Sequence, residues 1–284
     1  MGVSMSISEL KNMQRETWNG LAQPWFRWND LFEGGAISVT ERLIGLSEIC
    51  RSDTVLDVAC GLGDTSYSVS NTLSADGSVV GIDIADTMID ICKVRFQDRP
   101  NIEFISGDAE KYLKSDCYDA ILSRFGLMFF PDTAAILSEL YKALKPGKKL
   151  CFSVWATPEH VPLISLTFSE VAKALALPAP PASNPGPFKL SNKSELVAEL
   201  ERAGFKDVLI QKISVPFELE SAEEYLSYSK DILPKKISSC IDSDLSPSEK
   251  EALWKRILAR SNEYVQEGIV KMDCKAYCIS ATKI

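Results

Sequence analysis

Short apolar runs alternate with amphipathic segments over the first half of the chain. The spacing of apolar positions predicts helices over residues 8–31 and 36–50. Five β-branched or apolar runs then predict strands at 54–59, 78–83, 101–105, 118–123 and 149–155. Helical patterns separate these strands near 65–73, 85–97 and 132–144. This alternation predicts a parallel sheet with right-handed crossovers and helices on both faces.

The pattern becomes less regular near the start of the last strand of this series and beyond it. Pro146 and Gly147 are expected to end a helix and turn the chain into the strand at 149–155. A proline-rich stretch, 176–188, predicts a surface loop or lid, and Ser191 is expected to cap a helix that ends near Gly204. The remaining elements are expected to be helices over 162–175, 221–232 and 246–266 and strands over 207–219 and 271–284.

Composition and charge limit the possible partners and compartment. The 284 residues include 31 Lys and Arg against 39 Asp and Glu, a net charge of −8, which disfavours nucleic acid as a partner. The N-terminus does not resemble a secretory signal, and no apolar run approaches the roughly 18–20 residues of a membrane span. The eight cysteines are scattered and contain no CxxC pair, so we expect a reduced, cytoplasmic protein without a metal site.

A glycine-rich turn lies between the first predicted strand and its helix. In VLDVACGLGDTS, Gly61 and Gly63 let loop amides and the helix N-terminus approach a ligand closely. Asp57 lies near the carboxyl end of the strand, where burial of a carboxylate is costly unless a cationic group meets it. The next two strands also end in carboxylates, Asp83 and Asp108. Asp83 has the spacing of a residue that accepts hydrogen bonds from ribose hydroxyls, although each aspartate is alternatively a helix cap or turn former.

These motifs resemble the class I S-adenosylmethionine-dependent methyltransferases, in the small-molecule branch related to the ubiquinone and menaquinone C-methyltransferases. The resemblance rests on D-x-A-C-G-x-G at 57–63, GID at 81–83, GDAE at 107–110, SRFGLMFFPD at 123–132 and LKPGKKL at 144–150. It implies S-adenosyl-L-methionine as the cofactor. It assigns the methionine part of that cofactor to Asp57, Ala59, Gly61, Gly63 and Phe125, the ribose to Asp83, and the adenine to Ile84, Asp108 and Ala109. Ala59 stands where many relatives have glycine.

The pattern and the resemblance together predict an α/β fold, with a Rossmann-like, mostly parallel, seven-stranded sheet, helices on both faces and added helices that form a lid. We expect three parts. Residues 1–50 form an N-terminal helical cap segment, residues 51–156 form the S-adenosylmethionine-binding core, and residues 157–284 complete the sheet and add helical lid insertions.

The implied reaction needs alignment and exclusion of water more than a special catalytic group, because methyl transfer from a sulfonium is an in-line displacement. Two residues are candidates for catalysis. His160, the sole histidine, is a possible base, with an exposed loop residue as the alternative. Arg124 is a possible partner of a substrate oxyanion, with structural pairing as the alternative. The apolar lid segments favour a small apolar or aromatic acceptor, methylated on oxygen or carbon.

Three further groups have both a functional and a structural interpretation. The aromatic residues at 25–28 suggest a flap over the cofactor or the packing of a helix. Residues 128–130 are expected either to line a pocket for the methyl acceptor or to pack against a helix. Cys274 and Cys278 are expected to face the same side of a strand. There they either bind a soft metalloid or serve as small buried apolar residues.

Two other function classes remain open from the sequence. A nicotinamide-dependent oxidoreductase would use the glycine loop and Asp83, but Ser66 stands where its fingerprint needs a third glycine or alanine. A protein that binds S-adenosylmethionine without catalysis is also compatible, since no residue is an obligatory catalyst. Amino-methylating enzymes of nucleic acids are disfavoured because SRFG occupies the place of their N/D-P-P-Y/F motif.

Overall fold

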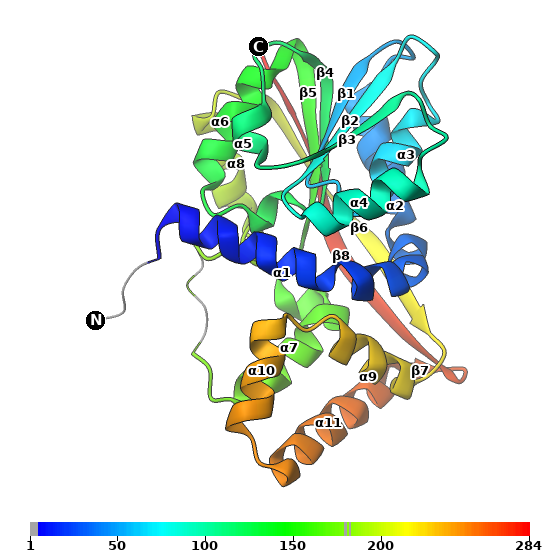
Figure 1. Cartoon of the computed structure of the whole chain (residues 1–284), viewed down its shortest axis with the longest axis vertical. Coiled ribbons are helices and arrows are strands. Elements are labelled where there is room, and N and C mark those ends of the chain that lie inside the picture. The colour runs from blue at the N-terminus through cyan, green and yellow to red at the C-terminus, as the bar shows by residue number, and fades with distance from the viewer. Residues whose placement is uncertain (1–4, 179–180, 182) are drawn as a thin grey trace.

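One twisted sheet organises the chain. The computed structural model describes residues 5–178, 181 and 183–284. Its strands have the order β3-β2-β1-β4-β5-β8-β6, and a short strand, β7, pairs with β8 (Figure 1). The strands are β1 (Thr54–Val58), β2 (Ser78–Asp83), β3 (Ile102–Ser106), β4 (Tyr118–Arg124), β5 (Leu144–Trp155), β6 (Lys206–Leu219), β7 (Val265–Gln266) and β8 (Ile269–Thr282).

The first five strands are parallel and β8 runs against them. β1 pairs in parallel with β2 and β4, and the ladders extend to β3 and β5. β8 is antiparallel to both β5 and β6. The predicted Rossmann-like, mostly parallel α/β sheet is therefore confirmed. The carboxyl ends of the five parallel strands meet at one edge, which is where folds of this class bind ligands.

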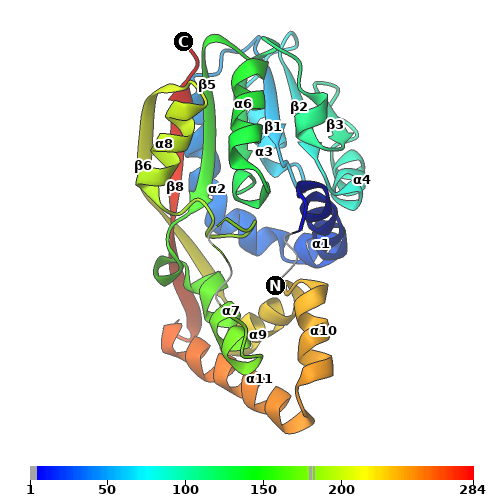
Figure 2. The ribbon, with the colours of Figure 1, turned by 90° about the vertical axis from the view of Figure 1, so that its left-hand side faces the viewer.

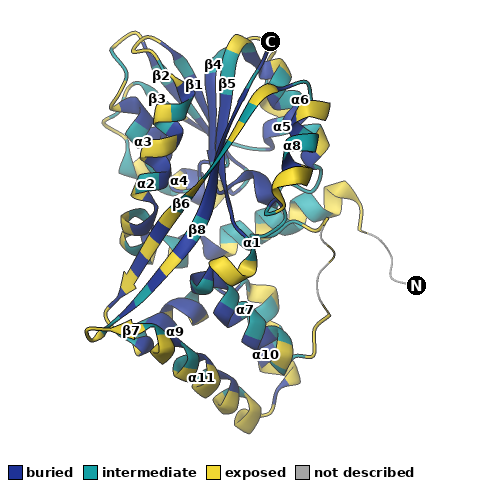
Figure 3. Ribbon diagram, turned by 180° about the vertical axis from the view of Figure 1, so that it is seen from behind, coloured by how far each residue is buried: buried dark blue, intermediate teal, exposed yellow. Residues whose placement is uncertain are grey.

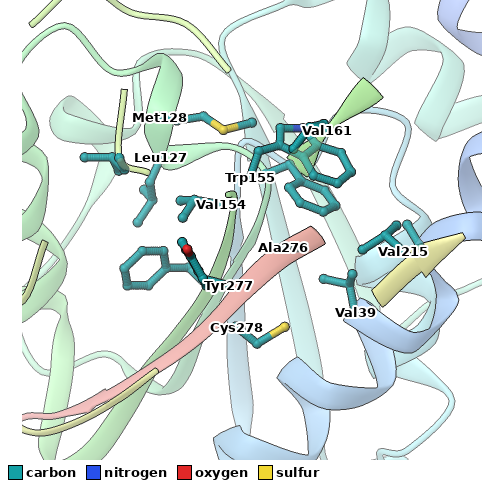
Figure 4. Close-up of a cluster of buried hydrophobic side chains, with 14 of the residues drawn as sticks. Val39, Leu127, Met128, Val154, Trp155, Val161, Val215, Ala276, Tyr277 and Cys278 are labelled. Carbon is teal, nitrogen blue, oxygen red and sulfur yellow. The ribbon is translucent and has the colours of Figure 1, made fainter. Parts of the chain in front are cut away.

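Helices cover both faces of the sheet. α2 (Asn29–Ser47) and α3 (Asp64–Ser70) lie on one face, and α6 (Thr133–Ala143) and α8 (Lys193–Arg202) on the other (Figure 3). Next to the sheet, Tyr277 and Cys278 of β8 point to opposite sides, with Val39 of α2 on the Cys278 side (Figure 4). Burial on both faces explains why the central strands β1 and β4 are largely apolar.

A second group of helices lies beyond the carboxyl edge. The long β6–β8 ribbon extends past the sheet, and four helices lie beside its far part. These helices, which we call the cap, are α7 (Pro162–Ala174), α9 (Ala222–Asp231), α10 (Lys235–Asp244) and α11 (Pro247–Ser261). α1 (Ile7–Arg27) runs between the sheet and the cap (Figures 1 and 2). Across the described residues, no helix combines the length and apolar character needed to cross a membrane.

Several predicted helix boundaries were wrong. The pattern over 8–31 is two helices, because Trp28 leaves helical geometry with φ −97° and ψ 13°. The helix predicted to reach 266 ends at Ser261 and is followed by the 3-10 helix η3 (Asn262–Tyr264) and by β7. Glu267 and Gly268, both with positive φ, then form the hairpin turn between β7 and β8. Three helices were not predicted from the sequence: α10, α5 (Ala109–Tyr112) and the 3-10 helix η1 (Leu127–Phe129). The helix α4 (Asp86–Arg95) was predicted.

Two predicted turn signals act differently in the structure. Pro146 and Gly147 lie inside β5, at an irregularity in its pairing with β4, and the Gly147 N–H donates to the Lys283 carbonyl at 2.8 Å. Asn192, not Ser191, caps α8, because its side chain accepts from the Ser194 and Glu195 amides. The described positions of the predicted loop at 176–188 contain neither helix nor strand, and residues 179–180 and 182 lie outside the described part.

Candidate functional site

The glycine loop connects β1 to α3 at the carboxyl edge of the sheet. Gly61 has φ +54°, and a Cβ atom built on it would meet no atom within 4 Å, so the loop faces open space there. Gly63 has φ +84°, and a Cβ atom on it would lie 2.9 Å from the Phe104 and Phe96 rings. Ala59 also has a positive φ, 54°, in the left-handed region where glycine is favoured. Glycine would adopt this conformation without strain, and this chain accommodates alanine there.

Asp57 is the most deeply buried of the three strand-end carboxylates. Its side chain is 1% exposed and accepts a hydrogen bond from the Ser66 hydroxyl at 2.7 Å. Burial raises the pKa of Asp57 to about 7, although Ser66 and the Arg124 charge pull it down. The carboxylate therefore lacks a full ionic partner among the described residues, so a cationic ligand group would be favoured there.

Asp83 links the end of β2 to the glycine loop. Its carboxylate accepts from the Gly61 amide at 2.9 Å and from the Ala85 amide at 2.8 Å. Burial raises the pKa of Asp83, and these backbone hydrogen bonds oppose the rise. Ile84 follows directly at the same edge and is half-buried. The side chain of Asp83 thus fixes the position of the Gly61 amide, where the glycine loop faces open space.

Asp108 ends the loop after β3 and caps α5. Its Oδ1 accepts from the Glu110 amide at 3.2 Å, and its Oδ2 pairs with Lys11 at 2.8 Å. Ala109, next to it, is buried. Lys11 also pairs with Glu110 at 2.8 Å, so this carboxylate, unlike Asp57, has a cationic partner from the protein.

Phe125 follows β4 with φ +58°, a rare conformation for an aromatic residue. Its amide donates to Ser153 and its ring stacks on Trp155, with ring centroids 4.0 Å apart. Backbone strain of this kind persists where the surroundings enforce it and is frequent at functional sites. The strained chain at Phe125 and Ala59 lies where β4 and β1, neighbours in the sheet, both end.

Of the two candidate catalytic residues, Arg124 ends β4 at this edge, whereas His160 lies in an exposed turn after β5. Arg124 is half-buried and forms a two-pronged ion pair with Glu33 of α2, with a further hydrogen bond to Thr40 at 2.9 Å. This geometry favours the structural role for Arg124. His160 is exposed in the turn η2 (Pro158–His160), and its side chain makes no hydrogen bond to any residue within the described ranges. A catalytic role for His160 remains a prediction.

The contacts that α1 makes with this edge were not predicted. Lys11 reaches Asp108, the Arg15 Nε donates to the Ile84 carbonyl at 3.1 Å, and Asn19 bonds to Thr87 at the start of α4. The three α1 residues are four apart, so they share one helix face. This periodic polar face was the available signal, but no local pattern shows what such a face contacts.

The remaining candidates are mostly packed into the protein. Trp25 contacts Trp18 and Phe32, whereas Trp28 donates to Asp231 of α9 at 2.9 Å. Met128 is buried, and the Phe129 ring lies 4.9 Å from that of Trp18. Cys274 and Cys278 are buried, and burial raises the pKa of each thiol to about 12, which favours the apolar interpretation.

A separate hollow of about 540 Å³ lies at the opposite edge, lined by residues that precede β2 and β3, among them Asp76 and Arg99. It does not contain any of the strand-end carboxylates. The carboxyl edge, with its strained loops and buried carboxylates, is therefore the better candidate site.

The chain is similar to known methyltransferases in both sequence and fold. Residues 55–147, which include the glycine loop and all three carboxylates, match the family model described as a methyltransferase domain. A demethylmenaquinone methyltransferase from Lactococcus lactis is 30% identical over 128 residues, which is 44% of this chain and 48% of that relative. Residues 55–147 are therefore a methyltransferase domain.

Solved structures share the fold of the methyltransferase domain and of most of the remaining chain. The YcgJ protein of Bacillus subtilis superposes with a TM-score of 0.59 at 19% identity, covering 87% of this chain and 98% of that one. Phosphoethanolamine N-methyltransferase 2 of Haemonchus contortus, solved with S-adenosyl-L-methionine, gives a TM-score of 0.58 at 15% identity. This match covers 99% of the present chain and 60% of the Haemonchus chain. The cofactor of this family of domains is S-adenosylmethionine. The chain spans about half the length of the curated relatives it matches.

Proposed function

We propose that this protein transfers a methyl group from S-adenosylmethionine to oxygen or carbon of a small, apolar or aromatic molecule. The observation that carries the proposal is the edge where Asp57, Asp83 and Asp108 lie at or just beyond the carboxyl ends of three neighbouring strands, around the open face of Gly61. The three carboxylates have different partners, which suits a ligand with three chemically different parts.

The surroundings of each carboxylate fit one part of the cofactor. Asp57, buried without a full ionic partner, suits the ammonium of the methionine part. Asp83, fixed by two backbone amides, retains acceptor capacity for ribose hydroxyls, with Ile84 against the adenine. Asp108 and Ala109 suit the adenine edge, because a carboxylate accepts from an amino group.

Glycine and strained residues complete the proposed cofactor site. The open space at Gly61 leaves room for the methionine part, and the close contact of Gly63 with two aromatic rings sets the path of the loop. Ala59 and Phe125, both with positive φ, place the ends of β1 and β4 beside it.

When bound, S-adenosylmethionine supplies an electrophilic methyl group on a cationic sulfur. The protein residues bind and orient this group and exclude water from it. Aromatic side chains between the sheet and the cap provide the dry surroundings: Trp18, Trp25 and Phe32 contact one another in series. Neither Arg124 nor His160 is needed in this proposal, because the first is committed to Glu33 and the second is exposed.

The acceptor class rests on the relatives and on the apolar cap. The L. lactis relative is a demethylmenaquinone methyltransferase, whose name indicates a quinone-type acceptor. In this chain the cap carries buried aromatic residues such as Tyr225 and Tyr228, which suit an apolar or aromatic acceptor better than a charged one.

Transfer of a radiolabelled methyl group to a panel of acceptors tests the proposal. The panel contains a 1,4-naphthalenediol, a simple phenol and a primary amine, with boiled protein as the blank. We expect label on the diol or the phenol. Label on the amine alone would contradict the proposed acceptor class, and failure with all three, in a protein that binds the cofactor, would favour a non-catalytic binding protein.

A further inference from the structure

One polar face of α1 holds the edge at which the adenosine part of the cofactor is proposed to bind. Lys11 bridges Asp108 and Glu110, with both distances 2.8 Å. One turn later, Arg15 donates to the Ile84 carbonyl at 3.1 Å. One turn further, Asn19 accepts from the Thr87 amide at 3.1 Å and from the Thr87 hydroxyl at 2.8 Å. Helix α1 thus crosses the ends of both β2 and β3.

Both carboxylate oxygens of Asp108 already accept a hydrogen bond from the protein. Oδ1 of Asp108 already accepts from the Glu110 amide in the α5 cap, and Oδ2 accepts from Lys11. The side chains of Lys11 and Asp108 are 16% and 9% exposed, so water and salt ions reach the ion pair only in part. A new donor at Oδ2 has to displace or share the ammonium of Lys11.

The two halves of α1 are held by different forces. The only residues buried within α1 are Leu21 and Ala22, both in its second half. That half is also tied to the cap, because Arg27 and Trp28 both contact Asp231 of α9. The first half is held chiefly by polar contacts, which exchange with water more easily than buried apolar packing.

We propose that the first half of α1 is a gate over the adenosine end of the cofactor site, closed by Lys11 competing with the adenine amino group for Asp108. The gate rests on the proposed function, since it needs the cofactor to bind at this edge. Helix α1 opens about its packed second half, and the cofactor enters as the Lys11 ion pair breaks.

Stopped-flow tryptophan fluorescence with S-adenosylhomocysteine as the probe tests the gate. The test variant is Lys11→Gln. The matched control is Lys111→Gln, which removes the same charge from an exposed position beside Glu110. Partly exposed ion pairs are worth roughly 0.2–1 kcal/mol, so we expect Lys11→Gln to raise the association rate by a factor of about 1.4 to 5. The control should match the wild type.

Salt separates the gate from a general effect of charge. Raising the salt concentration should speed association in the wild type, because it screens the Lys11 pair, and should have little effect on Lys11→Gln. An association rate in Lys11→Gln that equals or falls below that of the wild type would overturn the gate. A wild-type protein that does not bind S-adenosylhomocysteine would instead refute the proposed cofactor site, so the two failures are distinguishable.

Discussion

The replacement Asp57→Asn tests whether the buried Asp57 carboxylate serves cofactor binding although its charge destabilises the fold. The pKa of Asp57 is raised by burial to about 7, from a reference value of 3.8. The folded state therefore holds a proton on Asp57 between about pH 4 and pH 7, where the unfolded state has lost it. Stability from this group falls as the pH rises through that window and levels off above pH 7.

The size of the effect follows from the shift. About three pKa units correspond to on the order of 4 kcal/mol, because each unit is worth about 1.4 kcal/mol. Asparagine has nearly the same shape, can still accept from the Ser66 hydroxyl and does not ionise. We therefore expect Asp57→Asn to gain stability over the wild type as the pH rises from 4.5 to 8, by up to that amount.

Urea unfolding of both proteins, followed by fluorescence at several pH values between 4.5 and 8, measures the difference. Cofactor affinity of the wild type should rise with pH over the range in which its stability falls. The wild type should bind S-adenosylhomocysteine more tightly as the pH rises towards 7, and the variant should bind weakly with little dependence on pH. Equal changes of unfolding free energy with pH in the two proteins would refute the reasoning.

Three further changes give separate tests. Asp83→Ala should weaken cofactor affinity by about 1–3 kcal/mol, and it also removes the acceptor of the Gly61 amide; unchanged affinity in calorimetry would argue against the ribose assignment. Gly63→Ala should destabilise the fold by about 1–3 kcal/mol more than Gly147→Ala in urea unfolding, because both have positive φ but only Gly63 meets rings at 2.9 Å; equal losses would contradict this. His160→Ala should retain most methyl transfer in the radiolabel assay, and loss of turnover would restore its role as a base.

The sheet was predictable because its signals are local. The strands near 54, 78, 102 and 118 are short apolar runs between clear turns, and their alternation with helices permits few topologies. The three strand-end carboxylates were found in the same way, since parallel strands bring their carboxyl ends to one edge.

Other features depend on contacts between distant segments. The partner of Arg124 is Glu33, 91 residues earlier in the chain, and the partner of Asp108 is Lys11, 97 residues earlier. Neither pair has a local pattern. The boundary at Trp28 and the helix α10 were missed because weak or continuous helical periodicity does not show where a helix breaks.

Calorimetric titration of the wild-type protein with S-adenosylhomocysteine, and separately with NAD, tests the central claim most directly. We expect one site for S-adenosylhomocysteine and no heat of binding for NAD. Binding of NAD in place of S-adenosylhomocysteine would show that the three carboxylates at the sheet edge serve a dinucleotide, and it would contradict the account.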